Sequence, residues 1–268
     1  MERAFVNGVG LGYQVIGSGP KTVALLNGIG MSMAHWKPVA DELHRHGYRV
    51  LLHDFRGQLL SDRPEAPYSF EQHASDLAGL LHELGIDTAH IVGTSYGAEV
   101  ALTFARDYPS SCLSVVSIDG VTEYDAVLGA AVDLWKAAAL ADARVFYKAL
   151  IPWNYSAAYI KIHEHDLASR EDLVATLPRD YFEGFARLCD AFMDIDLTKD
   201  LGSIRCPCLA MVASEDIIKP PRYSRILADG VPGALYVEIP GSGHAVVIEK
   251  PDEVSSVLIE FLTGLTAN

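Results

Sequence analysis

The segment that most constrains the fold of this chain is residues 88–104. In it, a short apolar run is followed by the turn Gly93-Thr-Ser95-Tyr-Gly97 and then by a second apolar run that continues to Pro109. The first run predicts a buried strand and the second a helix. A serine on a sharp turn between a strand and a helix takes a strained backbone, and flanking glycines leave room where a Cβ would clash. The segment therefore predicts an exposed, nucleophilic Ser95 facing a helix N-terminus.

Apolar and amphipathic segments alternate on both sides of this turn. Further strands are expected at residues 23–27, 48–54, 113–118, 207–213 and 234–239, and helices at residues 33–46, 69–84 and 251–265. An antiparallel hairpin is expected over residues 4–17. This order predicts an α/β fold with a mostly parallel central sheet flanked by helices.

Residues 121–199 break this alternation, because they show only helical periodicity. We expect them to form a helical cap inserted after the sixth strand, over the carboxyl ends of the strands. Residues 1–120 and 200–268 would then be the two parts of one core. The alternative is a set of flanking helices with no role in a pocket.

Composition restricts the partners of the protein. The 268 residues include 21 Lys and Arg against 35 Asp and Glu, a net charge of −14, which argues against nucleic acid or an anionic membrane as the main partner. No segment has the length of a signal peptide or a membrane span, so a cytoplasmic protein, monomeric or homodimeric, is expected. Cys206-Pro-Cys208 is too closely spaced for a redox or zinc motif, so we expect no metal.

A nucleophilic serine needs a base, and imidazole suits neutral pH. Among ten histidines, His244 is best placed, because it lies in a glycine-rich loop directly after the last expected strand. Asp216 follows the preceding strand and would orient the imidazole, giving the chain order Ser, Asp, His. Glu215 and Asp119 are the alternative acids.

The negative charge that develops on a bound carbonyl oxygen needs hydrogen-bond donors. The backbone N–H of Tyr96, at the start of the helix, is one candidate, and the N–H of Ile29, in the loop 27–30 after the first buried strand, is the second. The alternative for the loop is a plain glycine turn between a strand and a helix.

Together these segments resemble the α/β-hydrolase family, in its small, capped, cofactor-free form that includes carboxylesterases, enol-lactonases and C–C bond hydrolases. The resemblance covers nearly the whole chain. It departs at Asn27, where the family usually has histidine, and at Leu59, where the stretch beginning Asp54-Phe-Arg-Gly57 usually has a second glycine. Serine at position 95 speaks against haloalkane dehalogenases and epoxide hydrolases, which use a carboxylate nucleophile.

The predicted function is a serine hydrolase that cleaves a small-to-medium, largely apolar ester, lactone or thioester through an acyl-Ser95 intermediate. Its partner would be a small-molecule acyl substrate. The alternatives are an acyltransferase or C–C bond hydrolase with the same three residues, and a non-catalytic binding protein that keeps the fold. The candidate pocket residues are Asn27, Trp135, Trp153 and Tyr155.

Overall fold

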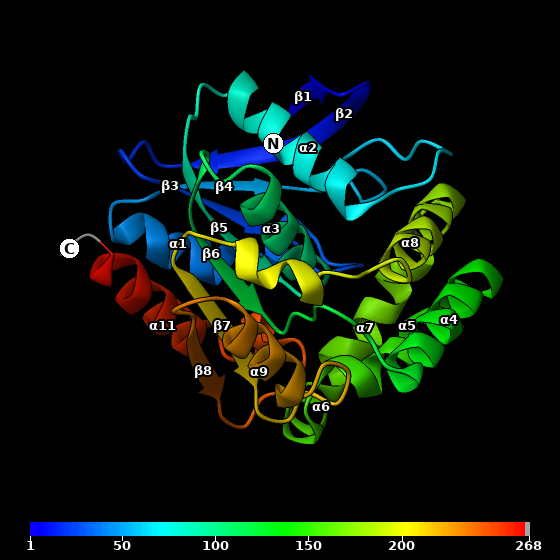
Figure 1. The fold of residues 1–268 in the computed structure, drawn as a ribbon. Helices are drawn as coiled ribbons and strands as arrows, with labels where there is room; N and C mark the ends of the chain where they lie inside the picture. The colour runs from blue at the N-terminus through cyan, green and yellow to red at the C-terminus, as the bar shows by residue number, and fades with distance from the viewer. Residues whose placement is uncertain (266–268) are drawn as a thin grey trace.

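The computed structural model describes residues 1–265 and is built on an eight-stranded sheet with the strand order β1-β2-β4-β3-β5-β6-β7-β8 (Figure 1). The strands are β1 (Glu2–Val6), β2 (Val9–Ile16), β3 (Thr22–Leu26), β4 (Arg49–His53), β5 (Ala89–Thr94), β6 (Cys112–Ile118), β7 (Cys208–Ala213) and β8 (Leu235–Ile239). β1 and β2 are antiparallel to each other and β2 is antiparallel to β4, whereas β3 to β8 run parallel. The predicted mostly parallel sheet behind an antiparallel hairpin is therefore confirmed.

The central strands are apolar on both faces because helices cover both faces. Every residue of β3 and of β7 is buried, whereas the edge strand β8 is mostly exposed or half-buried. Helices α1 (Lys37–Arg45) and α11 (Pro251–Gly264) share one core with one face of the sheet. Helices α2 (Phe70–Glu83), α3 (Tyr96–Asp107) and α9 (Pro221–Gly230) contribute to a second core.

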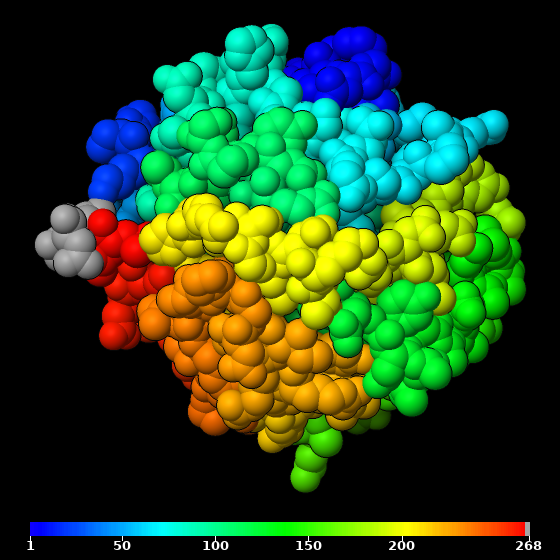
Figure 2. Space-filling view, viewed as in Figure 1, coloured from blue at the N-terminus to red at the C-terminus, as the bar shows by residue number. Residues whose placement is uncertain are grey.

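Three short helical segments lie between the longer elements of the fold. They are η1 (Met33–Trp36), η2 (Thr198–Ser203) and α10 (Val246–Glu249). Figure 2 shows the segment around η2, in yellow, crossing the surface between α3 and α9, both of which it contacts. Within residues 1–265, no helix is both long and apolar enough to cross a membrane.

The helices between β6 and β7 gather at one side of the molecule, where Figure 1 shows them apart from the helices that flank the sheet. They are α4 (Ala126–Ala141), α5 (Ala143–Asn154), α6 (Ala157–Ile162), α7 (Glu164–Ala175) and α8 (Arg179–Phe192). Asp125 and Asp142 accept hydrogen bonds from the first backbone N–H groups of α4 and α5, which fixes where these two helices begin. Trp135, Phe146 and Phe185 pack these helices on one another and onto the second core.

Candidate active site

Ser95 lies between β5 and α3 on a backbone that few residues other than glycine adopt. Its φ is 52° and its ψ is −119°. A Cβ on Gly93 would overlap the carbonyl oxygen of Gly97, and a Cβ on Gly97 would overlap that of Leu26. The two glycines are thus required by the close approach of backbone to backbone, as expected for a turn that presents a serine side chain.

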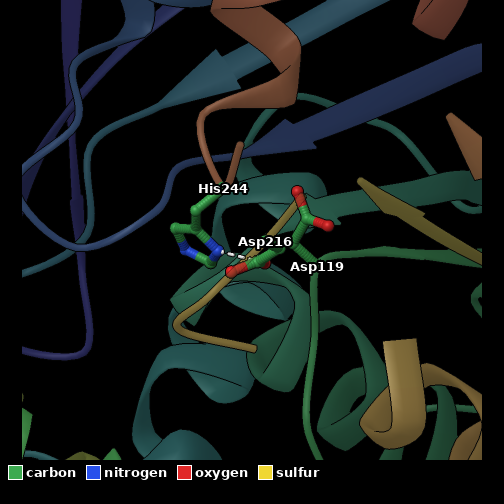
Figure 3. Close-up of side chains that lie close together, drawn as sticks. All are labelled: Asp119, Asp216 and His244. Atoms are coloured by element: carbon green, nitrogen blue, oxygen red, sulfur yellow. Dashed lines mark hydrogen bonds and ion pairs between the residues drawn. The ribbon is translucent and has the colours of Figure 1, made fainter. Parts of the chain in front are cut away.

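A chain of hydrogen bonds connects Ser95, His244 and Asp216. The Oγ of Ser95 lies 2.8 Å from Nε2 of His244, and Nδ1 of His244 lies 2.6 Å from Oδ2 of Asp216 (Figure 3 shows the second bond). An ionised carboxylate only accepts hydrogen bonds, so Nδ1 carries the proton and Nε2 is left as the acceptor for the Ser95 hydroxyl. This geometry can remove a proton from Ser95 during an attack on a carbonyl carbon.

The loops that carry His244 and Asp216 are themselves held in place by hydrogen bonds. Oδ1 of Asp216 accepts backbone N–H bonds from Ile218 and Lys219, both of 2.8 Å, so the other oxygen is left to face the imidazole. The backbone N–H of Ala245 donates to the carbonyl of Asn154 over 2.7 Å. The His244 loop is therefore tied to the end of helix α5.

The three candidate acids differ in burial and in hydrogen-bond partners. Glu215 is exposed, whereas Asp119 is fully buried beside Asp216 (Figure 3). Asp119 accepts the backbone N–H of Ala213 at 2.7 Å instead of the imidazole N–H. Burial, and then the neighbouring charge of Asp216, raise the pKa of Asp119 well above its usual value. A neutral Asp119 can therefore lie against an ionised Asp216.

The two candidate oxyanion donors lie beside Ser95. Ile29 and Tyr96 both line the cavity that contains Ser95 and His244. Within residues 1–265, neither backbone N–H has a hydrogen-bond acceptor. The Tyr96 ring is buried against Phe70, with ring centroids 4.9 Å apart, which holds the start of α3 in position. Both N–H groups are available to a ligand oxygen.

Asn27 has a different place from the one expected. Its side chain is fully buried, lies outside the cavity wall, and donates from Nδ2 to Oδ1 of Asp54 over 2.9 Å. Burial raises the pKa of Asp54, and this hydrogen bond is among those that counter the rise. Gln58 supports the same loop by donating from Nε2 to the Gly28 carbonyl over 2.8 Å. Asn27 thus anchors the loop that precedes Ile29 to Asp54 and does not line the cavity.

A cavity of about 430 Å³ opens between the helices α4 to α8 and the loops that carry Ser95 and His244. This volume suits a small-to-medium ligand. Trp135 and Tyr155 line it, whereas Trp153 does not, because its ring packs edge-on against Trp135 with centroids 6.1 Å apart. The apolar part of the cap wall comes mainly from α4, α5 and α8, through Leu128, Val132, Trp135, Phe146, Leu150 and Phe192.

The cavity wall also contains cationic side chains that we did not expect from the sequence. Lys219 lines the cavity, and its Nζ donates to Oε1 of Glu99 over 2.8 Å. Arg170, from α7, lines the cavity as well. The position of Lys219, three residues after Asp216, was a signal that could have been used. Arg170 offers no such signal, because it lies in a helix whose exposed residues are mostly polar.

Comparison with known proteins agrees with this geometry. A family model described as the α/β hydrolase fold matches residues 21–251. The putative carbamate hydrolase RutD of Pantoea ananatis is 31% identical over 259 residues, which cover 93% of this chain and 92% of that protein.

Solved structures are similar over almost the whole chain. MGS-M2, an α/β hydrolase enzyme from a deep-sea metagenome library, has a TM-score of 0.92 and 28% identity, covering 98% of this chain and 97% of that one. The enol-lactonase from Burkholderia xenovorans LB400 has a TM-score of 0.90 and 26% identity, covering 98% of this chain and 100% of that one. With its parallel sheet and its strand-turn-helix at Ser95, this chain belongs to the α/β-hydrolase fold family of hydrolytic enzymes.

Proposed function

We propose that this protein is a serine hydrolase that cleaves a small-to-medium carboxylic ester, lactone or thioester. The observation that carries the proposal is the hydrogen-bonded series of Ser95, His244 and Asp216. It lies at one wall of the cavity, next to the backbone N–H groups of Ile29 and Tyr96, which have no hydrogen-bond partner among residues 1–265. A nucleophile, its base, the group that orients the base and the donors for an oxyanion are the parts that acyl transfer needs.

In the proposed reaction, Oγ of Ser95 attacks the carbonyl carbon while its proton passes to Nε2 of His244. Asp216 stabilises the imidazolium that forms, and the N–H groups of Ile29 and Tyr96 bind the oxyanion. Collapse of the tetrahedral intermediate expels the alkoxide or thiolate, which takes the proton from His244. Water, activated by the same imidazole, then hydrolyses the acyl-Ser95 ester and releases the acid.

Carbamates are a second candidate substrate class. The support is the 31% identity with the putative carbamate hydrolase over 93% of this chain. Attack on a carbamate carbonyl would use the same residues, with nitrogen as the leaving atom. His244 would have to protonate that nitrogen as the C–N bond breaks, because an amide anion is a poor leaving group.

The test has two steps. Incubation with a fluorophosphonate probe should label the protein at Ser95, and the Ser95→Ala variant should not be labelled. Rates should then be measured on p-nitrophenyl esters of increasing acyl length, on simple lactones, and on alkyl N-(p-nitrophenyl)carbamates, which release p-nitroaniline when the C–N bond breaks. Labelling without turnover of esters or lactones would reject the proposed substrate classes. Absence of labelling in a folded protein would reject the serine mechanism and favour a binding protein.

A further inference from the structure

Arg170 places a cation in the cap wall of a largely apolar cavity. Its side chain lines the same cavity as Ser95 and His244. In the part of the chain that the structure describes, Arg170 forms no ion pair, and its hydrogen-bond partner is the hydroxyl of Tyr155, at 3.4 Å. The chain carries 35 acidic residues against 21 basic ones, so a half-buried arginine without an acidic partner is unusual here.

Two acidic side chains of this region, Glu171 and Glu249, are engaged with other partners. Glu171, the next residue, pairs with Arg144 over 3.2 Å. Glu249, whose charge acts on Tyr155, accepts the backbone N–H of Ser156 at 2.8 Å and its hydroxyl at 2.7 Å. The charge of Arg170 is therefore left without compensation by the protein.

Lys219, a second cation in the cavity wall, is in the opposite situation. Its ammonium group is paired with Glu99, and the two side chains are 4% and 0% exposed. This pairing leaves Lys219 without a free charge for a ligand. Arg170 is thus the better anchor for an anion in this cavity.

Two neutral polar side chains, Tyr147 and His35, line the same cavity as Arg170. The hydroxyl of Tyr147 is buried in the cavity wall and has no hydrogen-bond partner among residues 1–265. Burial raises the pKa of Tyr147 to about 12, so it is a protonated donor at neutral pH, and the charge of Arg170 acts on it as well as on Tyr155. His35 lines the same cavity, and burial and then the charge of Arg170 lower its pKa, which favours the neutral ring.

We propose that Arg170, with the hydroxyl of Tyr147, binds a carboxylate of the substrate on the cap side of the cavity. The substrate is then an ester, lactone or carbamate with an apolar body and an anionic end. A planar guanidinium binds a planar carboxylate through two parallel N–H bonds, and the surrounding apolar wall strengthens that interaction. This inference rests on the proposed function and adds an anionic end to the largely apolar substrate expected from the sequence.

A matched pair of substrates tests the subsite. Mono-p-nitrophenyl adipate and p-nitrophenyl hexanoate have the same acyl length and differ by a terminal carboxylate. We expect kcat/KM for the adipate ester to exceed that for the hexanoate ester by about tenfold or more in the wild type, after subtraction of the rate with Ser95→Ala.

Variants of the subsite should change this preference. Arg170→Met should lower kcat/KM for the adipate ester by about 10- to 100-fold, mostly through KM, with a much smaller effect on the hexanoate ester. Arg170→Lys should retain part of the preference, and Tyr147→Phe should lose part of it. Arg179→Met is the matched control, because this arginine of α8 is exposed, is paired with Glu183 and lies outside the cavity wall. It should leave the preference unchanged.

The outcomes separate the two proposals. If the wild type cleaved both esters without a preference for the charged one, the subsite proposal would be wrong. The same holds if Arg170→Met lost an equal factor of kcat/KM on both esters. In either case the proposed hydrolase function would stand. If neither ester were cleaved, binding of the adipate ester to Ser95→Ala should be measured by calorimetry. Binding lost in Ser95→Ala/Arg170→Met would then support the subsite while rejecting the hydrolase, and equal binding by both variants would overturn the subsite.

Discussion

Nζ of Lys219 lies 2.8 Å from Oε1 of Glu99, and this ion pair joins the loop that carries Asp216 to the helix that begins next to Ser95. The same Glu99 oxygen accepts the backbone N–H of Val121 over 2.8 Å. Segments that follow β5, β6 and β7 therefore meet at one buried carboxylate. This arrangement ties the helix that follows Ser95 to the loop that carries Asp216.

Removal of one partner of this pair should be costly. Lys219→Met leaves Glu99 buried without its counter-charge, and we expect the free energy of unfolding at pH 7 to fall by about 3 to 5 kcal/mol. The double variant Glu99→Gln/Lys219→Met should lose less than Lys219→Met alone, because no buried charge remains. Urea denaturation followed by circular dichroism would measure both.

Lys199→Met is the control, because its ion pair with Asp196 is exposed, and it should leave the urea midpoint of unfolding nearly unchanged. A double variant that is less stable than the single one would contradict this interpretation.

Ser95→Ala and His244→Ala should each lower kcat on the best ester by several orders of magnitude, and the double variant should be no slower than the slower single one. The reason is that nucleophile and base act in one step, so their losses do not add. Steady-state rates, with circular dichroism as the check on folding, would measure this. Near-wild-type turnover in either folded single variant would remove that residue from the mechanism.

The two buried aspartates should respond differently to the same substitution. Asp216→Asn replaces the acceptor of the His244 N–H, favours the wrong imidazole tautomer, and should lower kcat by roughly 10³- to 10⁴-fold. Asp119→Asn replaces a carboxyl group whose raised pKa favours the neutral form, so an amide of similar shape should cost at most about tenfold. The measurement is kcat for the two variants side by side. If Asp119→Asn lost more activity than Asp216→Asn, Asp119, at the end of β6, would be the residue that orients His244.

The turn around Ser95 should not tolerate a methyl group at its glycines. Gly93→Ala and Gly97→Ala each force a Cβ onto a backbone carbonyl, so we expect a large loss of soluble, folded protein or a fall in thermal midpoint. Gly202→Ala is the matched control, because its Cβ would meet open space within the described residues and its backbone has no positive φ. Its midpoint should stay equal or rise slightly. Equal behaviour of the three variants would show that close packing is not why the turn needs glycine.

Stability should fall on acidification because buried histidines are held neutral. Burial lowers the pKa of His53 to about 4 and that of His73 to about 3. Below pH 6.5 the unfolded chain therefore binds protons that the folded chain excludes, and the free energy of unfolding decreases until those lower values are reached.

His73→Phe removes one of these protonation sites. Neither ring nitrogen of His73 has a hydrogen-bond partner among residues 1–265, so the change breaks no hydrogen bond. We expect the loss of stability between pH 6.5 and pH 5 to be smaller by about 2 kcal/mol than in the wild type. Urea denaturation at both pH values measures the difference. The exposed His165, changed to Gln, is the control, and an equal pH dependence in all three proteins would contradict the assignment.

The fold could be predicted from the sequence because local patterns carry it. Apolar runs such as residues 23–27 have the length and composition of strands buried on both faces, and the helical segments between them force a parallel sheet. Ser95, Asp216 and His244 could be nominated for the same reason. Each lies in the turn or loop that follows a strand, and the carboxyl ends of parallel strands meet at one edge of the sheet.

What the sequence could not decide is which side chains from distant segments meet. Asp119 and Asp216 have similar local contexts, and only the direction of each carboxylate shows which one accepts the His244 N–H. Helical periodicity likewise identifies Trp135 and Trp153 as apolar positions in the cap, but not which of them lines the cavity. Periodicity tells which face of a helix is buried and says nothing of what the face is buried against.

The charges of the cavity wall are the clearest case. Lys219 and Glu99 are 120 positions apart in the chain, and their pairing follows from the packing of the Asp216 loop on α3. Arg170 is left unpaired because its acidic neighbours face other partners. Whether a cation is neutralised or free depends on atoms within a few ångströms of it, and such distances are set by tertiary packing and not by local sequence.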